Sequence, residues 1–248
     1  TFHQDTGEFG EVVSHMDEDN LPWRVALNWQ YNADTLLYAS MTEGFKSGVT
    51  PVNAANLAVQ NSPVEQEQLL AYELGVKATL LEQRMQFNAS AFYYDYTDKQ
   101  LAVFFADPIF TVLARLDNIP ESEAYGLDTQ LTWRMTTHLT AILAGTLLHT
   151  EVKNYEGIDA LAVPTDFNGA DFLYSPEQSG SATLFYDRPI ADNLGFAATL
   201  NGHYQSTSNG DLVGSQIAEI DSYSVLNGSI GVHTLDGRWD LTVWGNNL

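Results

Sequence analysis

The sequence predicts an all-β protein, an antiparallel transmembrane β-barrel. Three observations support this fold class: long stretches in which apolar and polar residues alternate, connections that are short and long in turn, and no apolar run long enough for a membrane helix. Strict alternation places one type of side chain on each face of a strand. A tilted strand of roughly 9–11 such residues crosses a bilayer, whereas a spanning helix needs about 20 apolar residues.

The stretch 70–93 shows the alternation most clearly. From Leu70 to Leu80 every second residue is apolar, and after a polar break at 82–84 the pattern resumes from Met85 to Tyr93. Two such strands joined by a tight turn form an antiparallel hairpin. In a membrane barrel the apolar residues of each strand face lipid and the polar residues face the lumen.

The other strands follow from the same pattern. Residues 1–20 are polar and acidic without a period, so we expect an extracellular loop there, and residues 21–248 are expected to form five hairpins. The remaining expected strands are 23–31, 35–41, 122–134, 139–150, 180–187, 195–205, 223–233 and 238–244. In the long connection 97–120, the apolar pieces 101–105 and 109–113 are expected to extend two strands beyond the membrane.

The connections alternate strictly in length. Long connections are expected between the hairpins. Short turns are expected within them, at five positions: Asn32, Glu82, Thr136, Pro189 and Asp236. Outer-membrane barrels have short periplasmic turns and long extracellular loops. All the long loops are therefore expected at one end of the barrel.

Large aromatic residues lie near both ends of the expected strands. Those beside short turns are Trp29, Tyr31, Trp133 and Trp239. Those nearer the long loops are Tyr72, Tyr93, Tyr125, Tyr204 and Tyr223. Membrane barrels carry aromatic girdles at both interfaces, so we expect two girdles here. Ordinary strand propensity of aromatic residues is the alternative explanation.

Charge narrows the function classes. The 248 residues include 32 acidic and 10 basic side chains, a net charge of −22, which argues against nucleic-acid binding. An acidic surface favours cations or basic ligands. Cysteine is absent, which fits an oxidising compartment. The first residues do not resemble a signal peptide, and since a membrane barrel must be exported, we expect an N-terminal segment lost by processing or truncation.

Several segments resemble the barrels of TonB-dependent outer-membrane receptors. They are LYAS at 37–40, GFKSG at 44–48, YELGVK at 72–77, NASAFYYDYTDKQ at 88–100, Asn118 with YGLD at 125–128, YSPE at 174–177 and VWGNNL at 243–248. Their order and spacing from about Trp23 to Leu248 carry the resemblance. It implies a 22-stranded barrel, of which about ten strands are present here, in the outer membrane of a Gram-negative bacterium.

The resemblance also implies a function. Such receptors import a scarce, bulky nutrient through a barrel closed by an N-terminal plug, using energy delivered by TonB. A ferric siderophore is the first expected ligand, because that class is common in the family, and a carbohydrate or cobalamin-like ligand stays open. The expected partners are outer-membrane lipid and lipopolysaccharide, the plug, TonB and the ligand. The plug, the TonB box and a last strand ending in an aromatic residue are missing, so the chain is expected to be the C-terminal part of a receptor, cut at both ends.

Candidate ligand-binding residues lie in the long loops, where aromatic rings are mixed with carboxylates. They are Tyr94, Tyr96, Phe104, Phe105, Phe110, His149, Phe172 and Tyr174. Aromatic loop residues line the binding sites of many receptors, although packing of loop against loop explains them equally well. The candidate lumen-wall residues are Glu73, Lys77 and Asp128, with Lys77 expected to balance Asp128 or Asp240.

No catalytic residue, cofactor or metal site is expected, since the six histidines show no ligand spacing. Two other function classes stay open. A complete ten-stranded barrel enzyme would need a site such as His149 with Asp159 or Asp171. A passive porin would need facing acidic and basic ladders, which ten basic residues make difficult to build.

Overall fold

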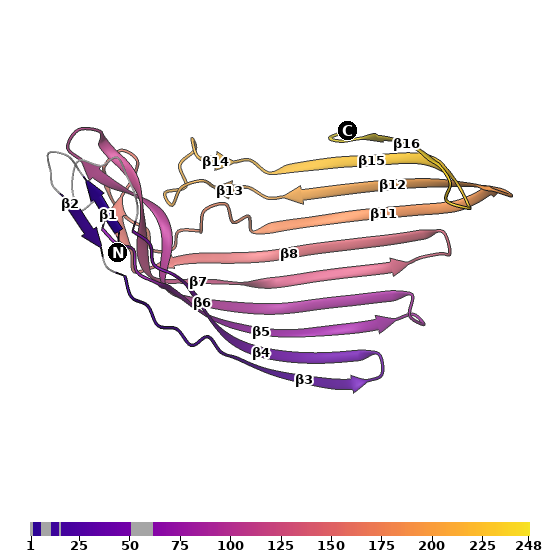
Figure 1. Ribbon diagram of the computed structural model, residues 1–248, viewed down its shortest axis with the longest axis horizontal. Helices are drawn as coiled ribbons and strands as arrows, with labels where there is room; N and C mark the ends of the chain where they lie inside the picture. The colour runs from indigo at the N-terminus through magenta and orange to yellow at the C-terminus, as the bar shows by residue number, and fades with distance from the viewer. Residues whose placement is uncertain (1, 6–10, 15, 51–61) are drawn as a thin grey trace.

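The computed structural model describes residues 2–5, 11–14, 16–50 and 62–248 of the chain, and every regular element in these ranges is a β-strand (Figure 1). No helix in these ranges is long and apolar enough to cross a membrane.

Ten strands form one continuous antiparallel path, in the order β16-β15-β12-β11-β8-β7-β6-β5-β4-β3 (Figure 1). Their bounds are β3 Arg24–Asn32, β4 Thr35–Lys46, β5 Glu67–Leu80, β6 Met85–Asp107, β7 Thr111–Arg134, β8 Leu139–Lys153, β11 Gln178–Ala191, β12 Leu194–Gln205, β15 Tyr223–Thr234 and β16 Asp240–Gly245. On this path each strand pairs with the strands before and after it in sequence, so the expected all-β antiparallel fold is confirmed.

The remaining strands are short. β9 Glu156–Ile158 pairs with β10 Pro164–Asp166 and contacts β6, while β13 Ser208–Asn209 pairs with β14 Glu219–Ile220. β1 Phe2–Asp5 pairs with β2 Glu11–Ser14. The first twenty residues therefore include a hairpin, which a polar stretch without clear alternation did not predict.

The two ends of the sheet differ. Five short turns lie at one end, at the right in Figure 1, and we call it the short-turn end. The opposite end does not carry only long loops, because the expected long connection 97–120 is mostly strand and β6 and β7 are joined there by a short turn at 108–110. Side chains close some of these turns: the Asn32 carboxamide oxygen accepts the Asp34 N–H at 2.8 Å, and the Thr136 hydroxyl accepts the N–H groups of His138 and Leu139. Such local side-chain hydrogen bonds favour tight turns. The opposite end, with the longer connections, is the long-loop end.

One face of the sheet, the apolar face, carries aliphatic side chains with little cover. Leu74 is 64% exposed, Leu147 54% and Val243 69%. Water would penalise so large an exposed apolar area, whereas a lipid contact would not. The described buried apolar cluster lies instead at the long-loop end, around Ile119 and Val152.

The apolar face also carries a row of rings toward the long-loop end. Tyr72 lies opposite Tyr93, Tyr93 opposite Tyr125, and Tyr125 opposite His149 on four neighbouring strands. The ring centroids are 6.3, 6.5 and 4.8 Å apart along this row. The row has the position expected of an aromatic girdle.

Tyr223 departs from this expectation. It lies opposite Gln205, and its hydroxyl donates to the Gln205 side chain at 3.1 Å, on the opposite face from Tyr204. Tyr223 is the first residue of β15 after a long connection. Tyr204 pairs with Ser224, so Tyr223, the residue before Ser224, points to the other face of the sheet. The position of Tyr223 near the end of its strand did not reveal which face its side chain occupies.

Candidate ligand-binding site

The site is built on a long hairpin at the long-loop end. β6 and β7 stay paired from Thr97 and Glu121 out to Asp107 and Thr111, so the predicted connection 97–120 is mostly strand (Figure 1). At the tip the Asp107 carboxylate accepts two backbone N–H groups, at 2.8 and 2.7 Å. This extension of β6 and β7, residues 97–121, positions the candidate residues described below.

The edge of β6 that β5 leaves open is partly covered by another segment. β5 begins at Glu67, and its pairing with β6 starts at Gln68 and Thr97. Farther out, Ile158 of β9 pairs with Phe104 of β6. Unpaired strand edges are left with unsatisfied polar groups, so β9 and β10 have a structural reason to lie here.

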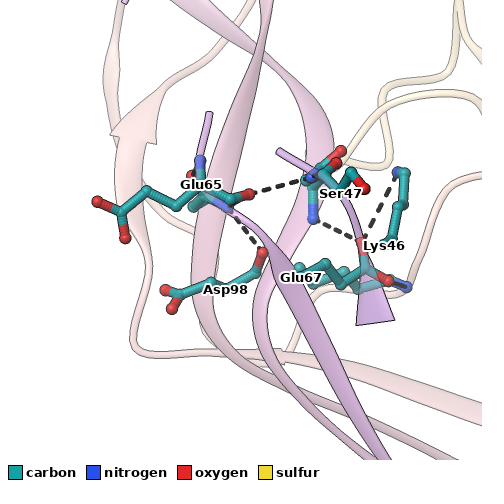
Figure 2. A network of polar contacts seen from close by, with 8 residues as sticks. Lys46, Ser47, Glu65, Glu67 and Asp98 are labelled. Carbon is teal, nitrogen blue, oxygen red and sulfur yellow. Dashed lines mark hydrogen bonds and ion pairs between the residues drawn. The ribbon is translucent and has the colours of Figure 1, made fainter. Parts of the chain in front are cut away.

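A polar network fixes the base of the extension, as Figure 2 shows around Ser47, Glu65 and Glu67. The side-chain amide of Gln100 donates to the backbone carbonyl oxygens of Ser47 at 2.9 Å and Glu65 at 3.0 Å. The Asn118 amide donates to the carbonyl oxygens of Glu65 and Asp98, and its own oxygen accepts the Glu65 N–H. Each of these bonds satisfies a backbone group that has no ladder partner.

Glu67 is the charged centre of this network. Its carboxylate accepts the Gln100 N–H at 2.9 Å and lies 3.7 Å from the ammonium groups of both Lys46 and Lys99. Lys46 is 57% exposed but Lys99 only 14%. Burial lowers the pKa of Lys99, and the Glu67 carboxylate opposes that shift.

Lys99 also lies among aromatic rings. Its ammonium group is 3.7 Å from the centroid of Tyr96 and 4.6 Å from that of Phe172. The two rings meet edge to face at 5.9 Å. Cation–π contacts of this kind join the extension to the segment after β10.

An apolar cluster continues this contact. Val103, Ile119, Val152, Phe167 and Phe172 are buried together, with Tyr94 and Tyr96 packed against them. Three predicted ligand residues, Tyr94, Tyr96 and Phe172, therefore have a packing role here: the two tyrosines of β6 and the loop residue Phe172 belong to one apolar cluster.

Two other predicted residues line a cleft of about 630 Å³ between the extension and the β9–β10 pair. They are Phe104 and Phe105, and they share the cleft with Ala106, Arg115, Asp117, Tyr155–Ile158 and Pro164–Asp166. We call this space the aromatic cleft.

The polar groups of the aromatic cleft are closely coupled. The Arg115 guanidinium donates to Asp117 at 2.7 Å and lies 5.6 Å from the centroid of the Phe105 ring. Burial raises the pKa of Tyr155 to about 12, and the Asp117 carboxylate adds to the shift. At neutral pH Tyr155 thus presents a neutral hydroxyl.

The last three predicted ligand residues lie elsewhere at this end. Phe110 is 59% exposed at the tip of the extension, and Tyr174 is 67% exposed beside a second, apolar pocket of about 230 Å³ lined partly by Val103 and Leu212. The His149 ring lies against Tyr125 on the apolar face.

The predicted lumen-wall residues lie on the polar face of the sheet. The Tyr38 hydroxyl donates to Glu73, and the Lys77 ammonium is 5.7 Å from the Tyr38 ring centroid. Tyr38 lies over Gly75, where any Cβ would overlap its ring. Asp128 accepts a hydrogen bond from Thr146 at 2.7 Å.

Charge balance between Lys77 and Asp128 or Asp240 stays a prediction. The contact described for Lys77 is with the Tyr38 ring, while Asp128 and Asp240 accept hydrogen bonds from threonine hydroxyls. Sequence spacing alone did not show that Tyr38 lies opposite Gly75, next to both Glu73 and Lys77.

Sequence reasoning also missed the residues that complete the site. Arg115, Asp117 and Tyr155 in the aromatic cleft, and Glu67 and Lys99 at the base, were not singled out. The available signal was the scarcity of basic residues, ten in 248, which makes a basic side chain inside an aromatic segment unusual. Among the described residues, no three His, Asp or Glu side chains are grouped to hold a metal ion.

The whole sequence, residues 1–248, matches the family model described as TonB dependent receptor-like, beta-barrel. The chain belongs to this family. No curated protein sequence matches it. The structural relatives are named as receptors and transporters, and one of them, the alcaligin receptor FauA from Bordetella pertussis, is named as an outer-membrane receptor.

Solved structures share the fold of this chain. The ferric yersiniabactin uptake receptor FyuA from Yersinia pestis is 17% identical to this chain, with a TM-score of 0.70. The matched region covers 91% of this chain and 31% of the FyuA chain. The siderophore receptor PiuA from Acinetobacter baumannii has a TM-score of 0.67 and 18% identity, covering 90% and 31%. The copper transporter OprC has a TM-score of 0.64 and 11% identity, covering 90% and 33%. The chain spans about a third of these receptors, and its sheet is a part of the barrel fold.

Proposed function

We propose that this chain is part of the barrel of an outer-membrane receptor that imports a scarce, bulky nutrient with energy from TonB, and that the nutrient is a ferric siderophore. Family membership supports the import role. Siderophore receptors among the structural relatives favour this ligand class, although identities below 20% transfer only the fold.

The aromatic cleft is the observation that carries the proposal. Its volume of about 630 Å³ lies in the range of small-molecule sites, and it combines apolar rings with a few convergent polar groups. The network at Glu67 and Gln100 holds its strands in place. A preorganised cleft of this kind binds more tightly because its side chains and strands lose little conformational entropy on binding.

The proposed roles divide by position. Phe104 and Phe105 contact the ligand in the cleft, and exposed Phe110 and Tyr174 meet it at the rim. Tyr94, Tyr96 and Phe172 support the cleft by packing, while His149 belongs to the ring row. Under this proposal the long-loop end is extracellular, the apolar face meets lipid and lipopolysaccharide, and the polar face with Glu73, Lys77 and Asp128 lines the lumen and contacts the plug.

The test uses the full receptor that contains this chain, expressed in a Gram-negative host lacking its own siderophore receptors. Uptake of radioactive iron is measured with a panel of ferric siderophores, with and without TonB. We expect uptake of at least one complex, dependent on TonB. Phe104→Ala combined with Phe105→Ala is expected to reduce uptake at least tenfold, while Ile217→Ala, at a fully exposed residue of another loop, leaves it unchanged.

TonB-dependent import of a cobalamin or an oligosaccharide, with no iron import, would contradict the ligand class but keep the receptor. Uptake that does not depend on TonB would contradict the import mechanism and favour a passive pore.

A further inference from the structure

The rim of the aromatic cleft carries two carboxylates that face each other. Glu156 of β9 and Asp166 of β10 are directly opposite in the antiparallel register, and both side chains are exposed. Like charges at directly opposite positions destabilise a strand pair. A positively charged group between them would remove that penalty.

The basic side chains in the long-loop segments are already paired with carboxylates. Four of the ten basic residues lie in the long-loop segments, and each has a carboxylate within 3.7 Å: Lys46, Lys99, Arg115 and Lys153. Inside the cleft, Arg115 is paired with Asp117, so Glu156 and Asp166 leave the lining with a net negative charge. A strongly anionic ligand would meet repulsion there.

The other lining groups suit a cation. Phe104, Phe105 and Tyr155 line the cleft, and aromatic rings attract ammonium groups through the negative side of the ring quadrupole. The Phe105 ring already holds a cation in this way, since the Arg115 guanidinium lies 5.6 Å from its centroid. Tyr155 stays protonated well above neutral pH and therefore adds no negative charge of its own.

We infer that the aromatic cleft selects ferric complexes without net negative charge, and favours those that carry an ammonium group, which lies between Glu156 and Asp166. Ferric trihydroxamates are neutral, or cationic when they bear a free amine, whereas ferric tricatecholates are trianionic. The inference rests on the proposed function and narrows its ligand class.

The experiment measures uptake of radioactive iron by the full receptor with three probes: a ferric trihydroxamate bearing a free amine, a neutral ferric trihydroxamate, and a ferric tricatecholate. We expect uptake in that order at equal concentration, with the cationic complex favoured at least tenfold over the trianionic one. Equal uptake of all three, or preference for the tricatecholate, overturns the inference but leaves siderophore import standing. Uptake of none of the three contradicts the proposed function and the inference with it.

A double variant tests the assigned carboxylates. Glu156→Gln with Asp166→Asn keeps the size and hydrogen-bonding capacity of both side chains and removes the charge. We expect the preference for the cationic over the neutral complex to fall about tenfold, while Glu219→Gln, an exposed carboxylate on β14, changes nothing. An unchanged preference in the double variant refutes the role of this pair. A normal amount of the double variant at the cell surface shows that misfolding is not the cause of a lost preference.

Discussion

Glu67→Gln is the change that we expect to loosen the long-loop end most selectively. The variant keeps an oxygen that accepts the Gln100 N–H, but it removes the negative charge between Lys46 and Lys99. Exposed Lys46 is solvated by water, so its ion pair contributes at most about 1 kcal/mol. Lys99 is 14% exposed and would keep a buried charge without its carboxylate.

The magnitude follows from that difference. Leaving a buried charge unpaired costs about 3–5 kcal/mol, and because Lys99 retains the faces of Tyr96 and Phe172, we expect about 2–4 kcal/mol. At about 1.4 kcal/mol for each factor of ten, this raises the equilibrium constant for local opening roughly 30- to 700-fold. Lys46→Gln is expected to change it less than about fivefold.

Hydrogen exchange with mass spectrometry on the full receptor in detergent measures this opening directly. Peptides covering 99–119 and 150–172 should lose protection in Glu67→Gln, while peptides in β15 stay unchanged. Adding Lys99→Met removes the buried charge, retains the packing, and should restore most of the protection. Equal effects of Glu67→Gln and Lys46→Gln would refute the reasoning from burial.

Three further changes test other parts of the structure. Gly126→Ala places a Cβ on a carbonyl oxygen of β8 and should abolish the folded receptor on heat-modifiability gels, while Gly44→Ala, with open space, folds normally. Leu143→Arg on the apolar face should destabilise the barrel in lipid vesicles by about 2–4 kcal/mol in urea titrations, and Ala144→Arg on the polar face should not. Because the pKa of Tyr155 is higher in the folded state than in the unfolded chain, stability falls as pH rises from the ordinary tyrosine value toward about 12, and in an alkaline absorbance titration Tyr155→Phe should reduce the amplitude of the latest phase.

The strands of the sheet could be predicted because their signal is local. Period-two alternation fixes which residues of one strand share a face, as from Leu70 to Leu80, without knowledge of the partner strand. The row of Tyr72, Tyr93 and Tyr125 followed from the same parity. Tyr223 failed because its face depends on the register of β15 against β12 after a long connection.

The candidate site was less accessible to sequence reasoning. The aromatic character of the loops was visible, and Phe104 and Phe105 do line a cleft. Its polar partners come from three separate segments, at Arg115, Tyr155 and Asp166, which the pairing of β9 with β6 brings together. The extension of β6 and β7 is also stabilised by burial of Val103 and Ile119 against distant loops, and alternation within one strand does not report that contact.

Cysteine labelling of intact cells tests most directly whether the aromatic cleft faces the outside. The chain has no cysteine, so Ile217→Cys at the long-loop end and Leu235→Cys at the short-turn end each introduce a single defined thiol into it. Both positions are exposed. With a maleimide reagent too large to pass the outer membrane, we predict labelling at 217 on intact cells and at 235 only after the membrane is permeabilised. Labelling at 235 on intact cells, with 217 protected, would contradict the proposed orientation and place the cleft on the wrong side of the membrane for nutrient capture.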